Sequence, residues 1–102
     1  MALSTMQFDG GVLTKVSSES EARSKAKSMI IVCATYNSYV YQVIIPKEKL
    51  TSTAQYFCVS YTTGTSYYDA FYVSAKTSAL SPSLVHNGSA VTASTTFEYY
   101  VD

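Results

Sequence analysis

The sequence has no tryptophan, a single histidine and few charged residues. Charged residues make up 14% of the chain, well below the roughly 25% of an average soluble domain. Seven basic residues balance seven acidic ones, so the formal net charge is zero. A neutral chain lacks the positive field that attracts nucleic acid, and little charge repulsion keeps its copies apart. We therefore expect no nucleic acid partner.

Long apolar runs and targeting signals are also missing. No run approaches the roughly 18 apolar residues of a membrane-spanning helix, and the longest, Met29 to Ala34, has the length of a strand. The first six residues show neither the basic nor the apolar region of a signal peptide. The only cysteines are Cys33 and Cys58, and without a signal peptide they indicate synthesis in a reducing cytoplasm. We expect no membrane partner.

Catalysis and metal binding lack the residue clusters that they need. The single histidine, His86, precedes Asn87-Gly88 in a predicted turn, where an exposed polar residue is common. A glycosidase needs two carboxylates that face a common cleft. Asp69 and Glu98 lie within strand patterns and could meet across a sheet, but nothing in the sequence places them together. Two isolated cysteines and one histidine do not have a zinc-binding spacing. We expect no catalytic, cofactor-binding or metal-binding residues, no cofactor, and a protein that is not an enzyme.

The strongest positive signal is a β-sheet pattern. Runs rich in β-branched and aromatic residues alternate with turn residues such as Asn37-Ser38, Gly64-Thr65 and Asn87-Gly88. This spacing predicts an all-β fold, an antiparallel β-sandwich or barrel of about seven to eight strands, in a single domain over residues 1–102. Ser81-Pro82 marks an expected loop over 76–83. The expected strands cover residues 3–8, 12–16, 28–36, 39–45, 55–63, 66–75, 84–86 and 90–101.

One segment, 17–27, has a helical pattern. Ser18 and Glu21 have the spacing of a capping box, in which each side chain caps a backbone N–H of the first turn. Beyond Ala22 and Ala26 the segment carries almost no apolar side chain to bury, so we expect a short exposed helix or an ordered loop. A single helical turn is expected at 47–50.

The turn positions also predict a register. They place Cys33 opposite Gln42, Gln42 opposite Cys58, and Cys58 opposite Phe71. Alternate strands lie roughly 9.5 Å apart, beyond the reach of a disulfide, so we expect two reduced and buried thiols.

The same register divides the apolar side chains between two faces. The face expected to form the core holds Ile30, Val32, Ala34, Tyr41, Val43, Ile45, Phe57, Val59, Tyr61, Tyr68 and Tyr72. The other face is also apolar, with Met29, Ile31, Val40, Ile44, Phe71 and Val73. A sheet that is apolar on both sides needs cover on both sides, and a neighbouring subunit could supply part of it.

Ten of the 102 residues are tyrosine. One interpretation is ordinary β-propensity, and the other is that several rings form a contact surface, since tyrosine combines an apolar body with a polar tip. The candidates for an interface are expected near turns or near residue 102 rather than in the middle of a sheet, and they are Tyr36, Tyr39, Tyr67, Tyr99 and Tyr100. The tyrosine-rich stretches 36–45 and 56–72 contain no Lys or Arg, which argues against nucleic acid binding.

In general character the chain resembles the small β-domains of tailed-phage virions, such as capsid decoration proteins and head-fibre bases. The shared features are the short neutral chain, the richness in Ser, Thr and Tyr, and the segment Tyr39–Leu50 (YVYQVIIPKEKL), a strand that runs into a Pro-Lys turn. The resemblance implies a structural protein that acts as repeated copies in a virion. Its partners would be copies of itself and other structural proteins. The alternative is a cytoplasmic, carbohydrate- or protein-binding β-sandwich module that uses exposed tyrosines.

Overall fold

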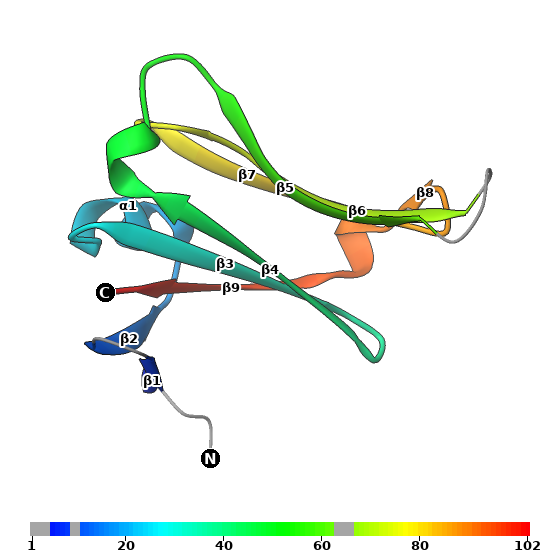
Figure 1. The fold of residues 1–102 in the computed structure, drawn as a ribbon, viewed down its shortest axis with the longest axis horizontal. Coiled ribbons are helices and arrows are strands. Elements are labelled where there is room, and N and C mark those ends of the chain that lie inside the picture. The colour runs from blue at the N-terminus through cyan, green and yellow to red at the C-terminus, as the bar shows by residue number, and fades with distance from the viewer. Residues whose placement is uncertain (1–4, 9–10, 63–66) are drawn as a thin grey trace.

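The computed structural model describes residues 5–8, 11–62 and 67–102, and its strands form two antiparallel sheets that pack face to face (Figure 1). The predicted all-β sandwich is confirmed. The five-stranded sheet has the order β1 (Thr5–Phe8), β2 (Gly11–Val16), β9 (Thr96–Val101), β3 (Met29–Tyr36) and β4 (Tyr39–Pro46). The four-stranded sheet has the order β5 (Gln55–Thr62), β6 (Tyr68–Lys76), β7 (Ala79–His86) and β8 (Ser89–Ala90).

The core lies between the two sheets and follows the alternation of each strand. Along β6 every second residue from Asp69 to Ala75 is buried, as expected when one face of a strand packs inward. Burying one such aliphatic or aromatic side chain stabilises the fold by roughly 1.5–3 kcal/mol. The largest fully buried side chains are Phe71, Ile30, Ile45, Leu84, Val32 and Val73. The predicted core positions in β3 and β4 are confirmed for Ile30, Val32, Ala34, Val43 and Ile45.

The predicted register between β5 and β6 is wrong by one residue. Cys58 pairs with Tyr72 and Val59 pairs with Phe71, whereas the sequence prediction set Cys58 opposite Phe71. A shift of one residue moves every side chain of a strand to the other face. Phe71 and its neighbour Val73 are therefore core residues, and Tyr72 is on the outer face. The predicted turn at 64–65 lies outside the described residues.

The predicted pairing of β4 with β5 is also wrong. The two strands belong to different sheets, because the connection around the short 3-10 helix η1 (Lys47–Lys49) carries the chain from one sheet to the other. The single helical turn expected there is confirmed. Cys33 pairs with Gln42 as predicted, but Cys58 lies in the other sheet. Both thiols are free, Cys33 half-buried and Cys58 exposed, so the expected burial of Cys58 is wrong.

The segment 76–101 differs most from the prediction. The expected loop over 76–83 is largely strand β7, which pairs with β6 through Pro82. Proline is tolerated there because β8 pairs only with the end of β7, at Val85 and His86, so Pro82 faces an open sheet edge. The expected long strand over 90–101 is divided by the 3-10 helix η2 (Thr92–Ser94), which separates β8 from β9 and moves the chain between the sheets.

The helix α1 (Glu19–Lys25) begins as the sequence predicts. The Ser18 hydroxyl accepts a hydrogen bond from the Glu21 backbone N–H at 3.1 Å, and Glu21 accepts in return from the N–H of Ser17, one residue before the expected one. Ala22 is fully buried and Ala26 nearly so, so the helix packs against the sheets through its small residues. The expected short helix is confirmed, and these two alanines are the only buried residues of the segment 17–27. No helix in the described parts of the chain is long and apolar enough to span a membrane.

Candidate functional site

Two of the candidate tyrosines, Tyr36 and Tyr39, flank the two-residue turn at Asn37-Ser38, as predicted. Asn37 adopts φ 52°, a left-handed conformation that asparagine tolerates better than most residues. The rings of both tyrosines lie against the His86 imidazole, with centroid distances of 5.1 Å for Tyr36 and 4.7 Å for Tyr39. Tyr36 also packs against the core, whereas Tyr39 is 48% exposed.

Tyr99 and Tyr100 do not lie at the margin of the fold. Their strand, β9, is bonded on one side to β2 and on the other to β3. Tyr99 packs against the core, and its burial raises the pKa of its phenol. Tyr100 lies opposite Lys15 and Ile31, on the outer face of the sheet. The expectation that these two rings avoid the middle of a sheet is wrong, and their role in an interface stays a prediction, as does that of the exposed Tyr67.

A polar cluster joins the two sheets, and we call it the Asp69 cluster: Tyr41 of β4, Asp69 of β6, His86 of β7 and Asn87 of the following turn. The Asp69 carboxylate accepts hydrogen bonds from the Tyr41 hydroxyl at 2.5 Å and from the Asn87 backbone N–H at 3.0 Å. His86 Nδ1 lies 3.1 Å from the same carboxylate, and since a carboxylate only accepts, Nδ1 carries the proton. Each oxygen of Asp69 therefore has a partner.

The electrostatics of the cluster favour an ionised Asp69. The hydrogen bond from Tyr41 lowers the pKa of Asp69, with smaller contributions from Asn87 and His86 that together outweigh the opposing effect of burial. Burial raises the pKa of Tyr41, and the neighbouring carboxylate adds to this increase. The tyrosine thus stays a neutral donor beside a charged acceptor. The imidazole is held by Asp69 and by two tyrosine rings, an arrangement that fastens one sheet to the other.

This cluster is not among the sites predicted from the sequence, although the sequence contains a signal for it. Asp69 occupies an inward position in the alternation of β6, and a carboxylate on the core face is rare unless it is bonded. The predicted register hid this, because it put Phe71 and Val73, which share the face of Asp69, on the face not expected to form the core. Glu98, the other carboxylate considered, forms an ion pair with Lys15 at 2.6 Å on the other sheet. The structure does not bring Asp69 and Glu98 together.

A different kind of surface runs along the side of the sandwich where β4 and β5 are the edge strands, and we call it the β4–β5 flank. β4 packs across β5 and β6 of the other sheet, so both edges lie on the same side. In Figure 1 these are the two green strands joined through η1, one in each layer. The large apolar side chains that these two strands expose most are Tyr39 (48%), Val40 (70%), Ile44 (55%), Tyr56 (70%) and Val59 (42%). Neither strand contains a charged residue.

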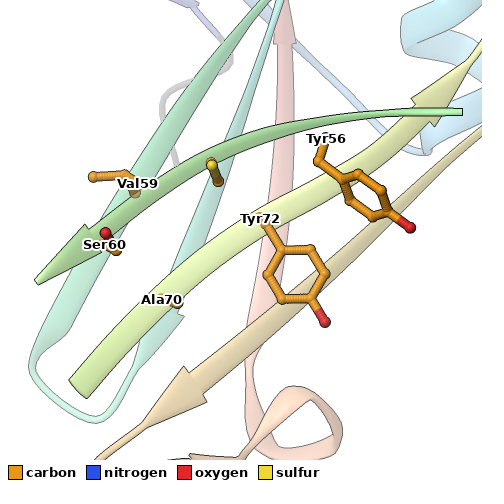
Figure 2. A pocket seen from close by; sticks show the side chains of 6 residues that line it. Tyr56, Val59, Ser60, Ala70 and Tyr72 are labelled. Atoms are coloured by element: carbon orange, nitrogen blue, oxygen red, sulfur yellow. The ribbon is translucent and has the colours of Figure 1, made fainter. Parts of the chain in front are cut away.

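The outer face of β5 and β6 bears an open apolar hollow of ≈ 440 Å³. Figure 2 shows the rings of Tyr56 and Tyr72 projecting side by side from the two strands. Their centroids are 6.2 Å apart and their planes meet at 64°. The hollow has no charged residue in its lining, which consists of Tyr56, Cys58, Val59, Ser60, Ala70 and Tyr72.

Metal-ligating side chains do not gather within the described residues, where no group of three or more His, Cys, Asp and Glu could hold an ion. Comparison with known proteins found no matching protein family, no matching curated protein and no matching solved structure.

Proposed function

We propose that this protein is a non-enzymatic structural protein that acts as repeated copies in a larger assembly, and that the assembly is a virion. The observation that carries the proposal is the β4–β5 flank, where two uncharged edge strands lie on the same side of the sandwich. Each exposes large apolar side chains, Val40 and Ile44 on the outer face of one sheet and Tyr56 on the outer face of the other. Edge strands of monomeric proteins usually carry Lys, Pro or a bulge that blocks pairing with another chain. On this flank the only such residue is Pro46, at the end of β4.

The energetics favour several contacts acting together. Fully burying one large apolar side chain contributes roughly 1.5–3 kcal/mol, whereas association costs about 4–15 kcal/mol in lost freedom of motion. No single residue of the flank could therefore hold two chains together, but the exposed side chains of both strands could. The zero net charge of the chain adds no long-range repulsion between copies. The virion is supported by the resemblance of the sequence to small phage β-domains.

The alternative is a binding module, and the Tyr56–Tyr72 hollow is the observation that favours it. A sugar ring stacks best on a flat aromatic platform flanked by hydrogen-bonding groups. Here the two ring planes are steeply inclined to each other and the exposed lining is almost wholly apolar. The hollow suits an apolar protein surface better than a carbohydrate, and so this alternative also leads to a protein partner.

The test is the native mass of the purified chain over a range of concentrations, for the wild type and for two variants that each add one lysine. Val59→Lys adds a charge to the flank, and Ser24→Lys adds the same charge to an exposed position of α1. We expect the wild type and Ser24→Lys to form oligomers, and Val59→Lys to lower the association constant by about tenfold or more, because an ammonium group would have to be desolvated. Matching melting temperatures for the three chains would exclude unfolding as the cause. A wild type that stays monomeric at high concentration would overturn the proposal.

A further inference from the structure

The strand β5 is an edge strand of unusual openness. Among the described residues no strand pairs with it on the side away from β6, so one row of its backbone N–H and C=O groups is unpaired. From Gln55 to Ser60 every residue except the half-buried Phe57 is exposed. The strand contains neither charge nor proline (QYFCVSYT), the two features that most often protect an edge.

The three other edges of the two sheets are better protected. β1 has four residues and β8 has two, which limits the number of hydrogen bonds that an added strand could form. The part of β7 that β8 leaves uncovered contains Pro82, which cannot donate to an added strand. β4 is as long as β5, but its inward side chains Val43 and Ile45 are already buried by the opposite sheet. On β5 the corresponding inward residue, Val59, shares the face of the buried Phe71 and is still 42% exposed. A strand added at β5 would cover it.

We propose that two copies of this chain join by antiparallel pairing of β5 with β5, across a two-fold axis that passes through Cys58. This inference rests on the proposed function and names the contact between copies. A strand paired antiparallel with itself is self-complementary, as a two-fold interface requires. Because β5 is uncharged, no like charges come to lie opposite each other at the axis. The two four-stranded sheets become one continuous sheet.

The position of the axis follows from the residues that it brings together. Paired residues of two strands share a face, so with Cys58 opposite Cys58 of the second copy, Phe57 lies opposite Val59 and Tyr56 lies opposite Ser60. Two Phe57–Val59 pairs then form on the inner face, and an aromatic residue opposite a β-branched one is a favourable cross-strand pair. These pairs cover the exposed Val59 of both copies.

The same geometry supplies a direct readout. Residues directly opposite each other in an antiparallel pair have Cα atoms roughly 4.5–5.5 Å apart, which lies within the range of about 4.4–6.8 Å that a disulfide spans. Cys58 is exposed, and Cys33 lies in the other sheet. In a Cys33→Ala chain, mild oxidation with diamide should therefore link two copies through Cys58. Diamide takes up the two electrons and two protons that the two thiols release.

A matched control moves the thiol along the same face of the same strand. In the variant Cys33→Ala, Cys58→Ser, Ser60→Cys the thiols of two paired copies lie four residues apart along the strands, too far to be linked. We expect the chain with Cys58 to form the linked dimer roughly tenfold faster or more, since pairing raises the effective concentration of the two thiols. Adding Val59→Lys to the Cys58 chain should abolish this advantage. The linked species is quantified by non-reducing mass spectrometry.

Three outcomes overturn the pairing. One is equal linking of the Cys58 chain and the Ser60→Cys chain, which indicates random collision. Another is efficient linking only in a mixture of the Cys58 chain and the Ser60→Cys chain. A link between position 58 of one copy and position 60 of the other would place the axis at Val59. The third is an oligomer by native mass with no Cys58 link, which refutes this pairing and leaves the proposed function standing. A monomeric wild type would refute both, so the two failures are distinguishable.

Discussion

The Asp69 cluster and the strand β5 lie next to each other in the fold, since Asp69 pairs across the ladder with Tyr61 of β5, yet they differ in every physical respect. The cluster is polar and largely buried, and both oxygens of its carboxylate are bonded. β5 is uncharged and exposed, and it has an unpaired edge among the described residues. We infer that stability and association are carried by different residues of the same sheet. Substitutions can therefore change one property and leave the other.

The largest effect on stability is expected from the double variant Tyr99→Ser, Tyr100→Ser. Both rings lie in β9 between two bonded strands, and Tyr99 packs against the core. Losing two partly buried aromatic rings should lower the free energy of unfolding by about 3 kcal/mol, as measured by urea denaturation.

The control for this double variant is Tyr56→Ser on the exposed face of β5. It should change the stability by less than about 0.5 kcal/mol while weakening association. An unchanged stability of the double variant together with lost association would reverse the assignment and make Tyr99 and Tyr100 interface residues.

The next largest effect is expected from Asp69→Ala. Removing the carboxylate leaves the Tyr41 hydroxyl, the Asn87 N–H and the His86 Nδ1–H without their acceptor. We expect a loss of about 2–3 kcal/mol in the free energy of unfolding, with association of the folded chain unchanged. Asp69→Asn keeps an acceptor oxygen and should lose less. Equal losses for the two variants would show that charge, and not hydrogen bonding, dominates at this position.

A smaller effect is expected from acid. The folded-state pKa of Asp69 is lowered, chiefly by the Tyr41 hydroxyl. The ionised Asp69 carboxylate therefore contributes fully to the free energy of unfolding above the unfolded-state pKa of about 3.9. This contribution is lost as the pH falls through the lower folded-state pKa. The pKa of Asp102 is lowered as well. Burial raises it, but hydrogen bonds from the Ser28 hydroxyl and from the backbone N–H groups of Ser28 and its neighbours outweigh that effect.

The measurement is the urea midpoint of the wild type and of Asp69→Asn between about pH 6 and pH 2. The wild-type midpoint should fall more steeply below about pH 4, because the variant lacks one of the carboxylates that titrate. Parallel curves would mean that Asp69 does not gain its stabilising effect from ionisation.

The sequence predicted best what is determined locally. The turns at Asn37-Ser38 and Asn87-Gly88, and the cap at Ser18, depend on neighbouring residues, and all three are confirmed. What failed depends on distant partners. The connection 47–54 looks like a link between adjacent strands, but which sheet the next strand joins is decided by packing. The sequence predicts a loop at Pro82, because the neighbouring residues do not reveal that this proline faces an open sheet edge.

The candidate site was predicted less well than the fold, and a single residue of register explains much of this. The slip between β5 and β6 exchanges the inner and outer faces of β6 alone, so the sequence places Tyr72 on the core face and Phe71 on the opposite face. The Asp69 cluster also needs Tyr41 from the other sheet, which no local pattern could supply. The exposure of β5 was missed because β4 was expected to pair with it.

The central place of β9 has a consequence for how the chain folds. Residues 96–101 come last among the described strands in chain order, yet they separate β2 from β3, and their partners lie some 60 to 90 positions earlier in the chain. The β3–β4 hairpin can form early because its two strands are joined by two residues, whereas β2 has no neighbour toward the core until β9 arrives. Such distant pairing is slow, since the entropy of closing a long loop is lost before the contacts form. The five-stranded sheet therefore stays incomplete until β9 inserts between β2 and β3.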